Sequence, residues 1–154
     1  MSVRLRDIRP DDKGALARFH SSLSDETRYR RYHAMKGDLT RGDLRYLTEV
    51  DGHSHVALVA ETDDGFLGVA RAVTDRPGEA ELAVVVADET QGEHVGHALV
   101  EGVLARMAQE GVPQVRAEVQ ADNHRALRFF QGFGARQRSV GGTVRELVIP
   151  TTRP

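Results

Sequence analysis

Three apolar, β-branched runs follow one another between residues 55 and 86, and a helical pattern begins a few residues later. The turn-rich segments TDDG and TDRPGE separate the runs HVALVAE, FLGVARAV and AELAVVV, which predicts an antiparallel meander. From Val95 the apolar residues recur at helical spacing until Gly111 and Pro113. A strand that leads through a glycine-containing loop into a helix directs free backbone N–H groups at one point. The loop QGEHVGHALV, residues 91–100, is therefore a candidate anion site.

Taken alone, this loop is equally compatible with a purely structural turn. No Gly-Lys-Ser/Thr follows it, and it lacks the G-x-G-x-x-G spacing of a dinucleotide fold.

The remaining chain alternates strands and helices. Before the meander we expect a strand over residues 3–8 and helices over 11–23, 24–33 and 40–50, with Asp11 or Asp12, Ser24 and Thr40 as their N-caps. After residue 110 we expect a strand over 115–119, a helix opened by Asn123, and a hairpin of residues 136–140 and 143–150 across Gly141 and Gly142. This order predicts an α/β (α+β) fold.

Composition limits the class of protein. The 154 residues predict a single domain, 1–154, with its own hydrophobic core. The absence of cysteine excludes disulfides, thiolate metal sites and a thiol nucleophile. Neither a signal peptide nor a membrane span is recognisable, so we expect a cytoplasmic protein. The 21 basic and 23 acidic residues are interspersed without a basic stripe, which argues against a nucleic-acid partner.

Two segments resemble the GNAT superfamily of acyl-CoA-dependent N-acetyltransferases. The family loop reads Gln or Arg, two residues, Gly, one residue, then Gly or Ala, and this chain has Gln91, His94 and Gly96 at those positions. The family's next segment is matched by Asn123, Ala126, Phe129, Phe130 and Gly134. Two departures are His94 in place of the loop glycine and Gly134-Ala135 in place of a terminal Gly-Phe.

Within the superfamily, the segments RDIRPDD, SLSDETRYRRYH, ELAVVV and EVQADN are most similar to the catalytic domains of bacterial Pat-type protein lysine acetyltransferases. The resemblance implies the GNAT fold, with a mixed, mostly antiparallel central sheet and helices on both faces. It also implies acetyl-CoA as cosubstrate and an amine as acceptor, with a protein lysine favoured and a small-molecule amine close behind. In Pat proteins the domain is fused to other modules, whereas we expect it to stand alone here. The sequence does not fix the oligomeric state, and a homodimer is compatible with it.

The resemblance also implies which residues hold the coenzyme. Backbone N–H groups of the loop and first helical turn would surround its pyrophosphate; these residues are Gln91, Gly92, Glu93, His94, Val95, Gly96, His97 and Ala98. The strand residues Val84, Val85 and Val86 would pair with its pantetheine arm. Asn123, Phe129 and Phe130 complete the predicted coenzyme site, although the two phenylalanines could equally pack in the core.

His94 is the unusual member of this set. A left-handed backbone at this position would cost a histidine roughly 1–2 kcal/mol. A protonated imidazole beside phosphate oxygens would add a hydrogen bond worth about 1.5–3 kcal/mol. We therefore expect His94 to weaken coenzyme binding slightly or to leave it unchanged.

Glu81 is the candidate general base. It lies near the middle of an apolar strand, where we expect it to be desolvated and its pKa to be raised towards neutrality. Such a carboxylate can take the proton that an ammonium must lose before it attacks a thioester, and Glu81 matches the position of the base in the Pat-type domains. The alternative is that Glu81 pairs with an arginine such as Arg71 and only stabilises the sheet.

Other features are less informative. Many family members have a tyrosine that protonates the leaving thiolate where this chain has Phe130, so water is the expected proton donor. The pairs His53 with His55 and His94 with His97 could each bind a metal but lack a third ligand, so no metal site is predicted. The rival to an enzyme is a non-catalytic acyl-CoA-binding or interaction module with a degenerate site.

Overall fold

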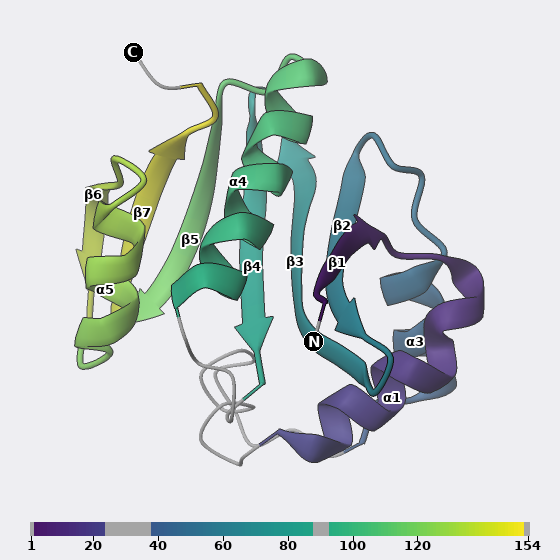
Figure 1. Ribbon diagram of the computed structural model, residues 1–154. Coiled ribbons are helices and arrows are strands. Elements are labelled where there is room, and N and C mark those ends of the chain that lie inside the picture. The colour runs from purple at the N-terminus through teal and green to yellow at the C-terminus, as the bar shows by residue number, and fades with distance from the viewer. Residues whose placement is uncertain (1, 24–37, 88–92, 153–154) are drawn as a thin grey trace.

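The computed structural model describes residues 2–23, 38–87 and 93–152 (Figure 1). In chain order the elements are β1 (Arg4–Asp7), the short 3-10 helix η1 (Pro10–Asp12), α1 (Lys13–Ser22), α3 (Arg41–Thr48), β2 (His55–Thr62), β3 (Gly65–Arg76), β4 (Glu79–Val86), α4 (Glu93–Gln109), β5 (Gln114–Gln120), α5 (His124–Gln131), β6 (Arg136–Gly141) and β7 (Val144–Pro150). The helix predicted for residues 24–33 lies outside the described residues.

The strands form one seven-stranded sheet in the order β1-β2-β3-β4-β5-β7-β6. Strands β4 and β5 are parallel, and every other neighbouring pair is antiparallel. The meander β2-β3-β4 and the hairpin β6-β7 are confirmed, as is a mixed, mostly antiparallel sheet. The parallel pair follows from α4, which carries the chain back across the sheet between β4 and β5.

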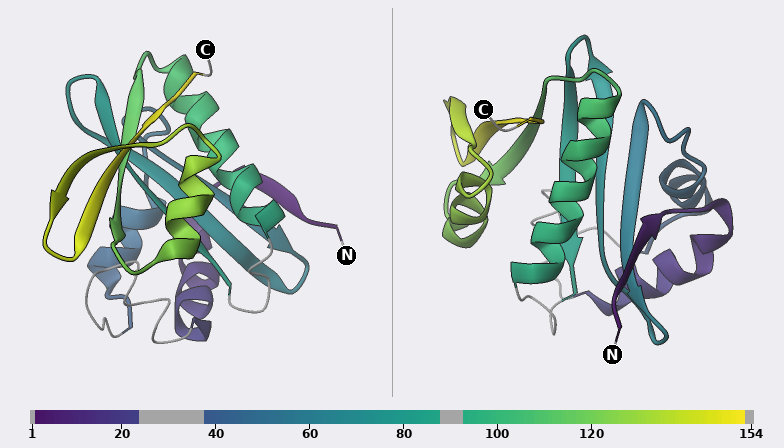
Figure 2. Two further views of the ribbon diagram at one scale, coloured as in Figure 1. Left: turned by 90° about the vertical axis from the view of Figure 1, so that its left-hand side faces the viewer. Right: turned by 45° about the horizontal axis from the view of Figure 1, so that its top comes forward.

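Helices cover both faces of the sheet (Figures 1 and 2). Helix α4 lies across the middle of one face, where its buried residues Leu99, Val103 and Met107 form one core cluster with the sheet. Helices α1 and α3 lie on the opposite face, over a second cluster that includes Phe19. Strand β2 contributes alternately to the two: Val56, Leu58 and Ala60 to the first, Ala57 and Val59 to the second. Burial on both sides explains why its sequence is almost continuously apolar.

The starts of α1 and α3 agree with the sequence in position, although the start of α1 differs in chemistry. Thr40 caps α3 as predicted: its hydroxyl accepts from the Asp43 backbone N–H (3.0 Å), and the Asp43 carboxylate accepts from the Thr40 N–H (2.9 Å). Asp12 is the residue before α1, but its carboxylate makes no cap hydrogen bond to that helix. It instead accepts two hydrogen bonds from the Arg6 guanidinium, both 2.9 Å, and one from the Arg9 N–H.

Candidate active site

Strands β4 and β5 separate after a short paired region. They are paired at Glu79 with Gln114, Ala80 with Val115, and Glu81 with Arg116. Beyond that point β4 continues to Val86 and β5 to Gln120, and the strands diverge (Figure 1). We call residues 82–86 of β4 and 117–120 of β5 the β4–β5 fork.

Within the fork, β4 is paired with a neighbouring strand along only one of its two edges. Its other neighbour, β3, stays paired with it as far as Gly68 with Val86. Within the described part of the chain, no strand pairs with residues 82–85 of β4 on the side that faces β5. Backbone N–H and C=O groups on such an edge can form hydrogen bonds with an extended ligand, much as an added strand would.

The three valines predicted to contact the coenzyme lie in this fork. Val84, Val85 and Val86 are all partly exposed. Val84 packs against the α4 side of the core, and Val85 packs against the α1 side. The structure therefore places their backbone at the fork, as the prediction requires, while their side chains are divided between the two faces.

Helix α4 begins beside the fork. Its first residue is Glu93, two residues before the expected start. A Cβ added to Gly96 would lie 3.5 Å from Cγ2 of Val86 and 3.6 Å from the ring of Phe129. The first turn of α4 is therefore packed between β4 and α5, and the positive end of the helix lies near the C-terminal end of β4.

His94 lies inside this first turn and is exposed. The left-handed backbone considered for this position is not adopted, because His94 is part of an α-helix, so the associated energetic cost does not arise. Gln91 and Gly92 lie outside the described residues. For Glu93 the structure describes the helical backbone alone.

The next helical residues are divided between solvent and core. Val95 and Ala98 are partly buried, whereas His97 is exposed on the helix surface. The ring centroid of His97 lies 4.7 Å from that of Phe133, and its Nδ1 lies 3.9 Å from the Glu101 carboxylate. A metal-binding role for His97 has no support in this geometry: among the described residues, no group of three or more His, Cys, Asp or Glu could hold an ion.

Helix α5 forms the far wall of the site. Asn123 caps it, as predicted, because its side-chain oxygen accepts from the Ala126 backbone N–H (3.2 Å). Phe129 is partly buried, with its ring 5.2 Å from that of Phe130 and 5.3 Å from that of Phe133. Phe130 is only 5% exposed and belongs to the core. Of the two roles considered for this residue, core packing is the one that its burial supports.

Glu81 is the last β4 residue before the fork, but it is not buried. Its side chain is 48% exposed, so the expected desolvation is absent. Helices α1 and α3 cover only part of this face of the sheet (Figure 2), in keeping with the exposure of the Glu81 side chain. The charged partner of Glu81 also differs from Arg71, the one considered from the sequence. Arg116, not Arg71, lies beside it, with Nη2 3.5 Å from the Glu81 Oε2.

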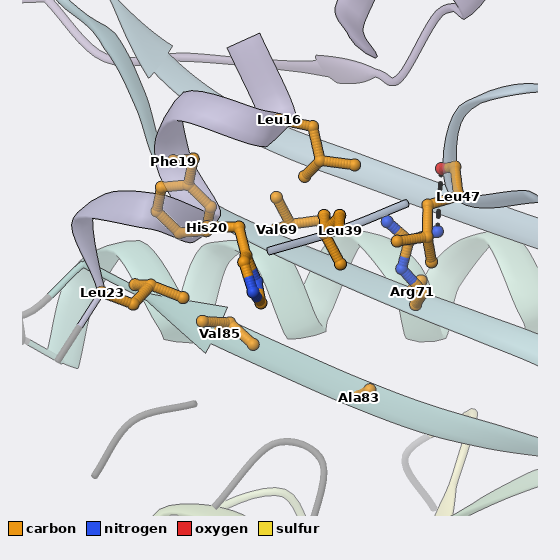
Figure 3. A pocket seen from close by; sticks show the side chains of 10 residues that line it. All are labelled: Leu16, Phe19, His20, Leu23, Leu39, Leu47, Val69, Arg71, Ala83 and Val85. Carbon is orange, nitrogen blue, oxygen red and sulfur yellow. Dashed lines mark hydrogen bonds between the residues drawn. The ribbon is translucent and has the colours of Figure 1, made fainter. Parts of the chain in front are cut away.

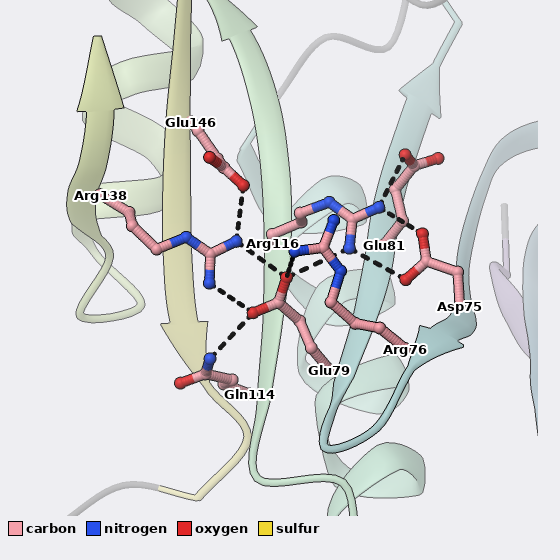
Figure 4. Close-up of polar contacts among 8 residues, drawn as sticks. All are labelled: Asp75, Arg76, Glu79, Glu81, Gln114, Arg116, Arg138 and Glu146. Atoms are coloured by element: carbon pink, nitrogen blue, oxygen red, sulfur yellow. Dashed lines mark hydrogen bonds and ion pairs between the residues drawn. The ribbon is translucent and has the colours of Figure 1, made fainter.

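Glu81 borders a group of charged side chains that sequence reasoning missed (Figure 4). We call it the polar cluster; its members are Asp75, Arg76, Glu79, Glu81, Gln114, Arg116, Arg138 and Glu146. Its centre is Glu79, whose side chain is 4% exposed. The Glu79 carboxylate accepts from Arg138 Nη2 (2.8 Å), Gln114 Nε2 (2.9 Å) and Arg116 Nη1 (3.1 Å).

The polar cluster holds two of its carboxylates, Glu79 and Asp75, in the ionised form. Hydrogen bonds from Arg138, followed by those from Gln114 and Arg116, lower the pKa of Glu79 to about 2 against the opposing effect of burial. Hydrogen bonds from Arg116 lower the pKa of Asp75. A signal for Arg116 was present in the sequence, because an arginine in the middle of the apolar run VRAEV requires a partner if the strand is buried.

A pocket lies on the α1 side of β4 (Figure 3). It encloses about 400 Å³ of empty space, part of which is open to solvent. Its lining residues are Leu16, Phe19, His20, Leu23, Leu39, Leu47, Val69, Arg71, Ala83 and Val85. Because Ala83 and Val85 also belong to β4, a ligand in the fork and a ligand in this pocket would lie on adjacent sides of one strand.

Arg71 and His55 form a buried pair beside this pocket. Arg71 Nη1 donates to Nε2 of His55 (2.9 Å) and to the carbonyl oxygen of Leu47 (3.0 Å). Burial, and next the positive charge of Arg71, lower the pKa of His55 to about 4. The imidazole is thus neutral at physiological pH and accepts the hydrogen bond. His53, its predicted companion, is exposed and contacts Glu110.

Comparison with known proteins places this geometry in a family. Residues 16–135 match the family model described as "Acetyltransferase (GNAT) family". The crystal structure of the GNAT domain of S. lividans PAT superimposes with a TM-score of 0.91 at 30% identity, covering 96% of this chain and 90% of that one. The predicted GNAT fold and the similarity to Pat-type domains are thereby confirmed.

Two curated relatives are longer than this chain. Acetyltransferase Pat from Mycolicibacterium smegmatis is 30% identical over 95% of this chain, which spans 45% of that protein. Mycothiol acetyltransferase from Brachybacterium faecium is 36% identical over 66% of this chain, which spans 33% of that protein. Among the described residues, no helix has the length and apolar character needed to cross a membrane. The chain belongs to the GNAT family of acetyltransferases.

Proposed function

We propose that this chain is an N-acetyltransferase, which binds acetyl-CoA in the β4–β5 fork and transfers the acetyl group directly to an amine. The observation that carries the proposal is the fork: among the described residues, no strand pairs with residues 82–85 of β4 on the side facing β5, and this edge ends near the N-terminus of α4. These two features suit the two parts of coenzyme A. The amide-containing pantetheine arm needs a strand edge, and the pyrophosphate needs backbone N–H groups and a positive dipole end.

Most of the coenzyme contacts in this proposal come from the backbone. Val84, Val85 and Val86 supply the strand edge, and the residues from Val95 to Ala98 belong to the first turns of α4. Gly96 fits this role because the helix must pass close to Val86 and Phe129 at that point. The exposed His94 can extend over the phosphates without backbone strain, and its protonated ring would add a charge-assisted hydrogen bond.

Glu81 is the proposed general base. Acetyl-CoA supplies a thioester whose carbonyl carbon accepts the amine nitrogen, so that a C–N bond forms and the C–S bond breaks. Glu81 removes a proton from the acceptor ammonium, directly or through water, and the coenzyme leaves as a thiolate that takes a proton from water. Glu81 lies on the same strand as the fork, four residues before Val85, and its exposed carboxylate is open to an acceptor.

The exposure of Glu81 changes the reason why it can act as a base. A desolvated carboxylate would hold a proton strongly, whereas the Glu81 side chain lies partly in water beside Arg116. Its proposed role therefore depends on its position at the fork and on its access to an acceptor, and no longer on desolvation. Backbone N–H groups of β4 in the fork are the proposed donors to the thioester oxygen, where negative charge develops.

The acceptor that we favour is a lysine side chain of a protein. This choice rests on the similarity to Pat-type domains in sequence and structure. A small-molecule amine is the second candidate, and the similarity to a mycothiol acetyltransferase supports it. The rival without chemistry is an acyl-CoA-binding or interaction module, which would bind the coenzyme and transfer nothing.

One experiment separates these functions. Purified protein is titrated with acetyl-CoA by calorimetry, and acetyl transfer to lysine peptides and small amines is then followed by mass spectrometry. We expect micromolar coenzyme binding, and we expect Glu81→Gln to lose most of the turnover at unchanged coenzyme affinity. Glu110→Gln is the matched control, because Glu110 is an exposed carboxylate just after the C-terminal end of α4, outside the fork, and no proposed step uses it. Full activity in Glu81→Gln would reject the base; binding without any turnover would favour the rival.

A further inference from the structure

The guanidinium of Arg116 is shared by three carboxylates from two neighbouring segments (Figure 4). Asp75 near the end of β3 receives two hydrogen bonds, one of them 2.9 Å long from Nη1. Glu79 accepts from Nη1 at 3.1 Å, and Glu81 lies 3.5 Å from Nη2. The Arg116 side chain is only 8% exposed. Its head group is therefore fixed from several sides and cannot follow Glu81 freely.

Arg116 also occupies a special position in the sheet. It is the residue paired with Glu81 in the last register pair before the β4–β5 fork. Any movement of Arg116 would shift the point at which the two strands separate. The contact with Glu81 thus joins the proposed base to the most firmly held cation at the fork.

We propose that Arg116 is the positioning residue for Glu81, and that Asp75 and Glu79 limit how strongly Arg116 holds it. This inference rests on the proposed function of Glu81 as a general base. An arginine devoted to one carboxylate would fix that group in place and make it a poor proton acceptor. Here Asp75 and Glu79 take the shorter hydrogen bonds, and Glu81 receives the longest one. Glu81 is oriented by this contact, while its exposed side stays open to an acceptor.

Other charged groups near Glu81 also influence how strongly Arg116 holds it. Beyond the three carboxylates, the charged or titratable groups described on this face include Arg76, Glu118, Arg138 and Glu146 of the sheet, with Arg71, His55 and His20 on the side of the pocket. Arg138 is suited to a control variant of the same charge type. It binds Glu79 and Glu146 in the same polar cluster, and no contact between it and Glu81 is found.

The proposal predicts shifts of opposite sign in the pH profile of acetyl transfer. Arg116→Met removes the cation that lies beside Glu81, so the acidic limb of kcat/KM should move to higher pH. Asp75→Asn leaves Arg116 with one fewer competing carboxylate, so the same limb should move to lower pH. Arg138→Met should leave the limb in place. Arg116→Lys, which retains the charge without the planar geometry, should restore the limb but not the full kcat.

The outcomes are distinguishable. Circular dichroism and thermal melting first establish that each variant is folded, and Asp75→Asn tests the idea alone if Arg116→Met does not fold. If the acidic limbs of Arg116→Met and Asp75→Asn coincide with that of the wild type while Glu81→Gln remains inactive, the positioning role is overturned and the proposed base stands. If Glu81→Gln retains full activity, the proposed base itself fails, and the role of Arg116 fails with it. Equal shifts in Arg138→Met would also overturn the proposal, because they would show a general effect of the cluster.

Discussion

Replacement of Glu79 by glutamine should make the stability of the fold less sensitive to acid. Glu79 is almost fully buried, and Arg138, Gln114 and Arg116 all donate hydrogen bonds to its carboxylate. These contacts lower its pKa from 4.5 to about 2. Such a difference corresponds to about 3 kcal/mol of folding free energy when the group is ionised.

The direction of the pH effect follows from the lowered pKa. As the pH falls, the unfolded chain binds a proton at Glu79 before the folded chain does, so protonation favours unfolding. The stabilisation is complete above about pH 5 and is lost between the two pKa values of 4.5 and about 2. At pH 3 about 2 kcal/mol of it should be gone. In Glu79→Gln this part of the pH dependence is absent, because the amide does not titrate.

Urea unfolding at pH 6 and pH 3 checks the prediction. Glu79→Gln should be destabilised by about 3–5 kcal/mol at pH 6, since the two arginines lose a buried partner. At pH 3 the gap between the proteins should narrow by about 2 kcal/mol. Other carboxylates titrate in both proteins and largely cancel in this difference. A gap of the same size at both pH values would refute the argument, because it would mean that Glu79 is not ionised through its contacts in the folded state.

Three further predictions concern other parts of the fold. Folding lowers the pKa of His55 from 6.5 to about 4, so the unfolded chain binds a proton at this residue first as the pH falls. The free energy of unfolding should therefore decrease by up to about 3 kcal/mol between pH 6.5 and pH 4, and urea unfolding of His55→Gln should show no such decrease. Thr40→Ala removes the cap of α3 and should lower the unfolding free energy by about 1 kcal/mol. Gly96→Ala should keep its melting temperature and coenzyme affinity, whereas Gly96→Leu should lower both, because only a methyl group fits between Val86 and Phe129.

Local sequence patterns predict most of the fold because they depend on neighbours in the chain. Alternation of apolar residues and turn-rich connections places β2, β3 and β4, and the Thr40 cap follows from its own sequence context. Asp12 shows the limit of this reasoning. Its position before α1 is as expected, but Arg6 attracts its carboxylate from a strand that lies beside it only after folding.

The site is harder to predict, because its charges meet across the sheet. The burial expected for Glu81 assumed that helices cover the whole face, yet α1 and α3 lie over only part of it (Figure 2). The contacts of Glu79 with Arg116 and Arg138 join residues 37 and 59 positions apart. Alternation within a strand shows which side chains share a face, but it does not show which strand becomes the neighbour. The order β4-β5-β7-β6 supplies that information.

The polar cluster and the β4–β5 fork are consequences of the same strand arrangement. Three residue pairs give β4 and β5 few backbone hydrogen bonds, and strands so weakly paired would tend to separate further. Arg116 joins β5 to β3 and β4, while Arg138 of β6 reaches Glu79 on β4. These side chains therefore close the sheet directly below the fork, where an apolar contact would leave the separation point free to shift. When the point at which β4 and β5 separate is fixed, the unpaired edge of β4 can stay accessible to a ligand while the two strands remain in one sheet. Charged side chains are expensive to bury, and at the point where β4 and β5 separate Arg116, Arg138, Asp75 and Glu79 are held by oppositely charged partners.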